Sequence, residues 1–218
     1  FYDHIKEIVD LHFSYQQKNG LLPDHIYGER FRWDPKRPWI RSMMADIEYA
    51  AVITVYETWQ ASGDDKWMSS LLPAIEKAMG YATGANEMWS KKYRLIKRPH
   101  TPDEWDFQIF DNSCFINKNT RFVLMHGDAA GLYLASLCLS KMYNVVKNKK
   151  KSSYWLDFAR GVYRRGNGLF WDRTKYVHHI HLDPVDHKDF NEKDQFTMSN
   201  TWSITRGFAS HKKVVSII

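Results

Sequence analysis

The chain has 218 residues, of which 44% are hydrophobic and 15% aromatic, and its formal net charge is +6 at pH 7. This composition supports one substantial core and excludes an intrinsically disordered protein. The basic residues fall in short local runs that are typical of solvated surfaces, and no nucleic-acid-binding motif accompanies them. No apolar stretch reaches the roughly 18 to 20 residues that span a bilayer. We therefore expect neither a nucleic-acid nor a membrane partner.

Helical periodicity recurs along the chain in blocks whose apolar residues return every three or four positions. The expected helices are residues 2–17, 45–59, 66–90, 128–146, 152–165 and a last one that starts after Ser210. The last block still has a helical pattern where the sequence stops, at residue 218. We expect one domain over residues 1–218 that is incomplete at both ends.

Two of the connections between these helices are short. Gly63, Asp64 and Asp65 form a tight turn in which an aspartate can cap the following helix. A short basic turn separates the fourth and fifth helices. Helices joined by such short turns are antiparallel neighbours, so the pattern predicts helical hairpins.

Three long connections alternate with the short ones, at residues 19–44, 91–127 and 166–209. In an up-and-down array of helices, alternate connections lie at the same end, so these three should share one face. Long connections in a compact domain are usually functional. The alternative is that they are insertions without a function.

The first long connection is rich in groups that bind sugars through hydroxyl edges and apolar faces. Its candidates for substrate binding are Tyr27, Arg30, Arg32, Trp33 and Asp34. A network of Arg and Asp ion pairs that fastens the connection would explain the same residues.

The second long connection holds three carboxylates within four positions, beside a tryptophan. Glycoside hydrolysis needs one carboxylic acid to protonate the leaving oxygen and a second carboxylate to activate water or to attack carbon. An acid beside an aromatic side chain can have its pKa raised by desolvation, so Asp106 and Glu104 are candidates for the general acid and Trp105 for a sugar platform. Alternatively, Asp103 and Glu104 are solvated and Asp106 caps a turn.

His126 and Asp128 mark the entry to the fourth expected helix and would point toward the loop end. Both are candidates for substrate binding. An N-cap role would explain Asp128 without any contact to substrate.

The third long connection contains a run of histidines and aspartates, with His179, His181, Asp183 and His187. The alternation of the first three would place them on one face of a strand, and imidazole with carboxylate suits zinc or iron. Because the spacing matches no familiar metal site, we expect no metal and a hairpin whose His and Asp side chains line the cleft or satisfy each other. His181 is the candidate for substrate binding. Glu192 follows as a further carboxylate.

Two segments resemble the six-hairpin glycosidases, the superfamily of trehalases, glucoamylases and glycogen-debranching glucosidases. Residues 46–78 resemble their repeated pair of inner and outer helices, with its Ser-Gly-Asp turn. Residues 104–107 (Glu-Trp-Asp-Phe) resemble the trehalase-like segment whose aspartate is the general acid. The resemblance implies an all-α fold of (α/α)6-toroid type, complete or partial, with long loops and a small β-hairpin on one face. It also implies that Asp106 is the acid, and Glu192 stands in for a base from a late hairpin.

The sequence therefore predicts a glycoside hydrolase that acts on an oligosaccharide or glycoside and needs no cofactor. The resemblance implies that it inverts the anomeric centre and that α-glucosidic bonds are the default substrates. One alternative is a non-catalytic carbohydrate-binding or scaffold module of the same fold. Another is a metal-dependent enzyme that uses residues 178–187. Oligomeric state and compartment stay open.

Overall fold

The computed structural model describes residues 2–23, 26, 45–100, 116–185 and 191–218. In these ranges the chain is mostly helical, with short antiparallel strands between the helices. The helices are α1 (Tyr2–Ser14), α2 (Ile47–Ser62), α3 (Asp65–Gly84), α4 (His126–Val145), α5 (Lys149–Phe170), a 3-10 turn η2 (Glu192–Asp194), α6 (Met198–Thr205) and α7 (His211–Ile217). The strands are β1 (Trp89–Ser90), β2 (Leu95–Ile96), β3 (Arg98–Pro99), β4 (Phe122–Met125) and β5 (His179–His181).

The turn between α2 and α3 has the expected chemistry. Gly63 closes α2 in the left-handed conformation, with φ of 70°, which glycine adopts without steric cost. The Asp64 carboxylate then accepts a hydrogen bond from the backbone N–H of Trp67 at 3.0 Å and caps α3. The prediction of a helical hairpin at this turn is confirmed.

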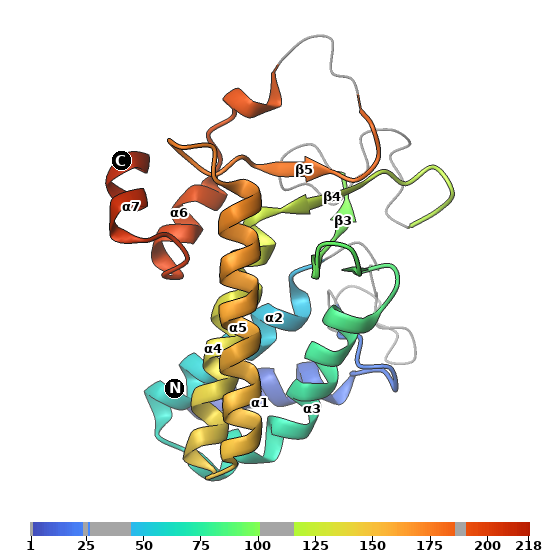
Figure 1. Cartoon of the computed structure of the whole chain (residues 1–218). Helices are drawn as coiled ribbons and strands as arrows, with labels where there is room; N and C mark the ends of the chain where they lie inside the picture. Colours follow the sequence, from blue (N-terminus) through green and yellow to red (C-terminus); the bar gives the residue numbers. More distant parts are fainter. Residues whose placement is uncertain (1, 24–25, 27–44, 101–115, 186–190) are drawn as a thin grey trace.

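Helices α4 and α5 form the longest hairpin and lie side by side through the centre of the molecule (Figure 1). The side chain of Asn148 caps α5 by accepting from Lys151 N–H at 3.1 Å, so the basic residues belong to the first turn of α5 instead of to a loop. The expected end of α5 at residue 165 is wrong, because the helix continues to Phe170. Gly166 does not stop the helix; it admits the ring of Phe208, which lies 2.6 Å from where a Cβ would be.

A three-stranded antiparallel sheet lies at the end of α4 and α5 that is opposite their connecting turn (Figure 1). Its strand order is β3-β4-β5, with Arg98 and His181 both paired to Val123 of the central strand. The sequence predicts a β-hairpin within residues 178–187, whereas β5 pairs with β4, which is more than 50 residues earlier. The expected strand is present, but the prediction that it pairs within residues 178–187 is wrong.

The described ends of the second and third long connections lie toward this sheet, and the short turns lie at the other end (Figure 1). This arrangement agrees with the expected up-and-down array. The start of the first long connection lies beside α3, where Gly20 approaches Lys77. Helix α6 was missed, because Met198–Thr205 forms barely two turns within a segment that reads as a loop. Helix α7 begins after Ser210 as expected, although the Ser210 side chain makes no capping hydrogen bond.

The core lies between α2, α3, α4 and α5. Val52, Val55, Ile75 and Leu139 are fully buried in it, and residues of this size each contribute about 1.5–3 kcal/mol when removed from water. No helix in the described ranges is both long and apolar enough to cross a bilayer.

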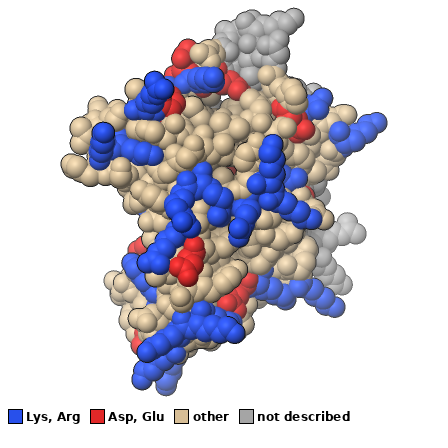
Figure 2. All heavy atoms as spheres, in the orientation of Figure 1, with Lys and Arg blue, Asp and Glu red and all other residues tan. Residues whose placement is uncertain are grey.

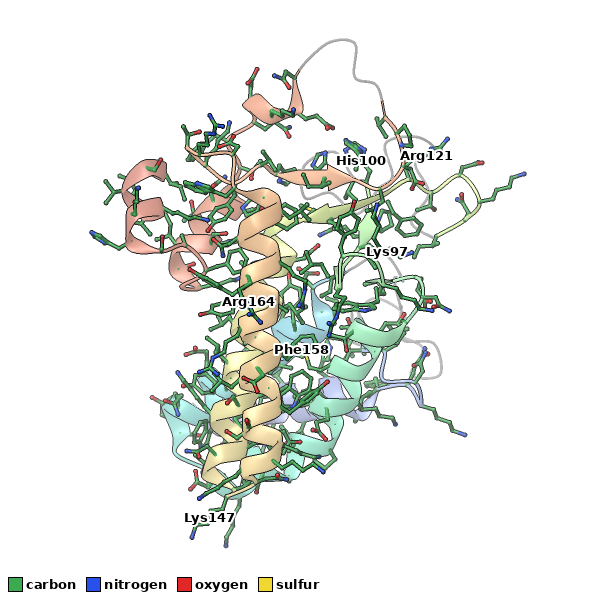
Figure 3. All side chains as sticks on the ribbon, viewed as in Figure 1. Lys97, His100, Arg121, Lys147, Phe158 and Arg164 are labelled. Atoms are coloured by element: carbon green, nitrogen blue, oxygen red, sulfur yellow. The ribbon has the colours of Figure 1, made fainter. Side chains whose placement is uncertain are left out.

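Lysine and arginine side chains lie in separate groups over the visible face, with acidic side chains among them (Figure 2). Figure 3 places Lys147 at the turn between α4 and α5, far from the sheet.

Candidate functional site

Three histidines and one glutamate converge at the sheet. His179 and His181 are two positions apart on β5, so their side chains share one face. His100 follows β3 and continues its ladder, because its N–H donates to the carbonyl of Arg121 at 2.7 Å. Since directly opposed residues of an antiparallel pair project to the same side, the register places His100 on the face of His181. Glu192 approaches from η2.

We call His100, His179, His181 and Glu192 the His–Glu cluster, because their imidazole nitrogens and carboxylate oxygens lie close together. His179 Nε2 lies 3.2 Å from His181 Nε2. Glu192 Oε1 lies 3.1 Å from His179 Nε2 and 3.4 Å from His100 Nε2. Glu192 Oε2 is 2.5 Å from His181 Nε2. One ligand atom from each of the four residues therefore falls within 4.8 Å of all the others.

The side chains of the cluster differ in exposure, and their contacts affect the ionisation of Glu192. The side chains of His100 and His179 are each 4% exposed, whereas His181 and Glu192 are about one-fifth exposed. Burial alone would raise the pKa of Glu192, but the hydrogen bond with His181 and the proximity of His179 outweigh it, and the pKa is lowered. Glu192 is thus a carboxylate at neutral pH, able to act as a base or as a metal ligand but not as a general acid.

A second polar group lies beside the cluster, at the start of α4. The Tyr49 hydroxyl donates to Asp128 Oδ1 at 3.0 Å, and Arg98 Nη1 lies 3.8 Å from the same oxygen. Burial raises the pKa of Asp128 despite the opposing charge of Arg98. Asp128 is the third residue of α4 instead of its N-cap, which is Met125. The alternative of a capping aspartate is therefore wrong.

His126 is fully buried, stacked on Tyr176 with ring centroids 5.4 Å apart. Its Nδ1 lies 3.3 Å from the His178 carbonyl oxygen. Burial lowers the pKa of His126 to about 4 and that of His178 to about 3, so both rings are neutral at pH 7. This placement favours a packing role for His126 over the expected contact with a sugar.

Most of the sequence-predicted site residues lie outside the described residues, so their roles stay predictions. These are Tyr27, Arg30, Arg32, Trp33, Asp34, Glu104, Trp105 and Asp106, together with His187 of the histidine run.

Within the histidine run, the expected grouping holds only in part. His179 and His181 share a face as predicted, but the carboxylate of Asp183 accepts a hydrogen bond from the N–H of Phe122 at 2.8 Å and fastens β4. Glu192 supplies the carboxylate of the cluster in its place.

Sequence reasoning missed His100 and Arg98. Both lie in the second long connection, next to the segment that holds Asp106. An isolated histidine carries no periodic signal, and its pairing with β5 depends on a register set by β4, so no local pattern could have identified it. Figure 3 shows His100 at the sheet, close to Arg121.

Comparison with known proteins gives a likeness of fold. No protein-family model matches the chain, and no curated protein sequence matches it. Among solved structures, the chain is similar to a GH78 family rhamnosidase of Bacillus sp. GL1, with a TM-score of 0.66, 11% identity and coverage of 97% of this chain and 20% of that one. It is also similar to a rhamnosidase from Klebsiella oxytoca with rhamnose bound, with a TM-score of 0.64, 13% identity and coverage of 99% and 36%.

These matches identify the fold as the helical-hairpin type of the α/α toroids, as the sequence predicts. The chain spans about a fifth and about a third of the lengths of the two rhamnosidases. The closer resemblance to trehalases and glucoamylases is not confirmed by these matches.

Proposed function

We propose that the protein is a glycoside hydrolase that receives its substrate at the sheet end of the helical hairpins. The observation that carries this proposal is the backbone likeness to two rhamnosidases over nearly the whole chain. The resemblance of residues 104–107 to the acid-bearing segment of six-hairpin glycosidases supports the same class of reaction. Because fold alone does not determine function, the reaction itself has to be measured.

In the proposed mechanism, Asp106 protonates the glycosidic oxygen while a second carboxylate activates water on the opposite face of the sugar. Inversion follows if the two carboxyl groups are about 6.5–9.5 Å apart, which leaves room for the water. Glu104 is the alternative acid. The ionised state of Glu192 would suit the base expected from the sequence, but three imidazoles surround it and favour the different use argued in the next subsection.

The first substrates to test are α-L-rhamnosides, because both structural neighbours are rhamnosidases. The α-glucosidic substrates expected from the sequence belong in the same panel. L-Rhamnose and D-glucose differ in the configuration of their ring carbons and at C6, where rhamnose has a methyl group and glucose a hydroxymethyl group. An apolar contact or a hydrogen bond at that position would therefore discriminate between them.

The test is hydrolysis of aryl α-L-rhamnosides, aryl α-glucosides and disaccharides by the full-length protein, with the product anomer followed by NMR. Asp106→Asn keeps the size of the side chain and removes the transferable proton, so we expect kcat to fall by about 10²–10⁴-fold. Asp103→Asn is the matched control, since it removes a carboxylate three positions away that has no role in the mechanism. It should retain the activity of the wild type.

Each contradicting result has a distinct meaning. Equal activity of Asp106→Asn and wild type would show that another residue is the acid, with Glu104→Gln as the next variant. Retention of the anomeric configuration would refute the inverting mechanism. No hydrolysis of any substrate, combined with saturable sugar binding, would refute the hydrolase and favour the non-catalytic carbohydrate-binding module.

A further inference from the structure

We propose that His100, His179, His181 and Glu192 bind a divalent transition-metal cation, with Zn²⁺ as the best fit. This inference goes beyond the proposed hydrolase function and does not depend on it. It rests on the geometry of the His–Glu cluster, the chemistry of its donor atoms and the elements that carry them.

Three of the separations between donor atoms are close to those of a tetrahedral site. Zinc–nitrogen bonds of about 2.0–2.1 Å at the tetrahedral angle place neighbouring ligand atoms about 3.3 Å apart. The cluster shows 3.2 Å between His179 and His181, and 3.1 and 3.4 Å from Glu192 Oε1 to His179 and His100. The 2.5 Å contact of Glu192 Oε2 with His181 is shorter, and one ligand atom of each of the four residues lies within 4.8 Å of the others.

The close contacts among these atoms bring nitrogen lone pairs and carboxylate oxygens together. Each neutral imidazole has one N–H donor and one acceptor nitrogen. If His179 and His181 both donate through Nε2 to Glu192, their two N–H groups meet at the 3.2 Å contact between the nitrogens. If either Nε2 is an acceptor instead, its lone pair faces an oxygen of Glu192. A cation at the centre would be attracted by every one of these lone pairs.

The donor set selects the cation. Three imidazole nitrogens and one carboxylate suit Zn²⁺ and other late first-row divalent metals, whereas Mg²⁺ and Ca²⁺ prefer all-oxygen sites. Two of the imidazoles are almost completely buried, which shields a bound cation from water and favours a firmly held ion.

A bound cation would join three separate parts of the chain: the end of β3 at His100, strand β5, and the turn η2 at Glu192. His100 directly precedes the connection of residues 101–115, and η2 follows residues 186–190. The cation would thus fix the chain on one side of each of these connections. Glu192 would be a ligand, and the base of the proposed hydrolysis would be another residue.

The experiment uses the full-length protein, stripped with a chelator and titrated with ZnCl₂ alone in isothermal calorimetry. We expect one Zn²⁺ per chain with a Kd below about 1 µM, because four-ligand protein sites bind Zn²⁺ more tightly than this. At a free Zn²⁺ concentration 100-fold above Kd, Tm should rise by about 5–10 °C. MgCl₂ at the same concentration should not change Tm. Cobalt(II) should give the intense visible absorption of a four-coordinate ion.

Variants test the assignment of ligands. His181→Gln and Glu192→Gln are conservative and lie at the more exposed side of the cluster, so we expect both to fold, with circular dichroism as the check. Each should weaken Zn²⁺ binding by about 100-fold or more, since even the partners that only orient ligands contribute about 10–100-fold. His211→Gln removes an exposed imidazole at the start of α7. As the matched control, it should bind Zn²⁺ like wild type.

The proposal is overturned if the stripped protein binds no Zn²⁺ stoichiometrically, or if folded His181→Gln and Glu192→Gln bind it as tightly as His211→Gln does. Its failure is separable from failure of the hydrolase. Asp106→Asn should lose hydrolysis and keep Zn²⁺ binding. A protein that hydrolyses glycosides but binds no Zn²⁺ would refute only the metal site.

Discussion

Replacement of Gly131 by alanine should destabilise the fold because α4 has no room for a methyl group there. A Cβ on Gly131 would lie 2.2 Å from Cε2 and 2.6 Å from Cζ of the Tyr49 ring, whereas non-bonded carbons need about 3.5 Å. Tyr49 is only 2% exposed, so the ring can move only by displacing core neighbours and by releasing Asp128. Overpacking costs about 1–3 kcal/mol, and a buried carboxyl that loses its partner costs about 1–3 kcal/mol. We expect the free energy of unfolding to fall by about 2–6 kcal/mol.

Gly80→Ala is the matched control in α3, at an exposed helical position where a Cβ meets nothing within 4 Å. There the same change should stabilise the protein by about 0.5–1 kcal/mol, because alanine has the higher helix propensity. Urea denaturation followed by circular dichroism measures both, with equal m-values required for the comparison. If Gly131→Ala were as stable as wild type, the close contact between α2 and α4 would be wrong.

Three further substitutions test the buried polar groups by urea denaturation. Tyr49→Phe leaves Asp128 without its hydrogen bond and should lower the free energy of unfolding by about 1–3 kcal/mol; no loss would mean that the bond does not form. The pKa of His126 is about 4 in the folded state and about 6.5 in the unfolded chain, so its contribution to stability is present above pH 6.5 and is lost as pH falls toward 4. In His126→Gln, the free energy of unfolding should therefore change less with pH between about 4 and 6.5 than it does in wild type. The same pH dependence in both proteins would contradict the burial of the neutral ring. Burial raises the pKa of Glu48 to about 7, so its contribution to stability is present below about pH 4.5 and is lost as pH rises through 7. The free energy of unfolding of Glu48→Gln should therefore rise relative to that of wild type across this interval. A difference between the two that does not change with pH would refute the pKa shift.

The parts of the fold that were predicted depend on contacts close in sequence. Helical periodicity located α1 to α5, and the Gly63-Asp64 turn identified the α2–α3 hairpin because its capping hydrogen bond spans three residues. The expected end of α5 at residue 165 is wrong, since sequence does not show that Gly166 stays helical and admits the ring of Phe208. That outcome depends on a neighbour 42 positions away.

In the candidate site, too, the sequence predicted the local features and missed those that depend on long-range pairing. The period-two spacing of His179 and His181 predicted their common face, since side-chain alternation is a property of any strand. Their association with His100 depends on β4 lying between β3 and β5, which is a long-range pairing. The expected partner Asp183 has the right spacing but uses its carboxylate on Phe122 N–H, a choice that only the sheet register decides.

The helices and the sheet end of the chain carry different buried polar groups, and substitutions in the two places should have different effects. The helices contribute Tyr49 and Asp128, whose hydrogen bond is buried in the core, whereas the His–Glu cluster comes entirely from strands and connections at the sheet end. Changes in the helical pair should therefore appear first in stability, and conservative changes at His181 or Glu192 should appear first in ligand affinity. A variant of Glu192 that lost stability in proportion to Tyr49→Phe, with no change in Zn²⁺ affinity, would make the cluster part of the scaffold. Loss of affinity at unchanged stability would make it a site.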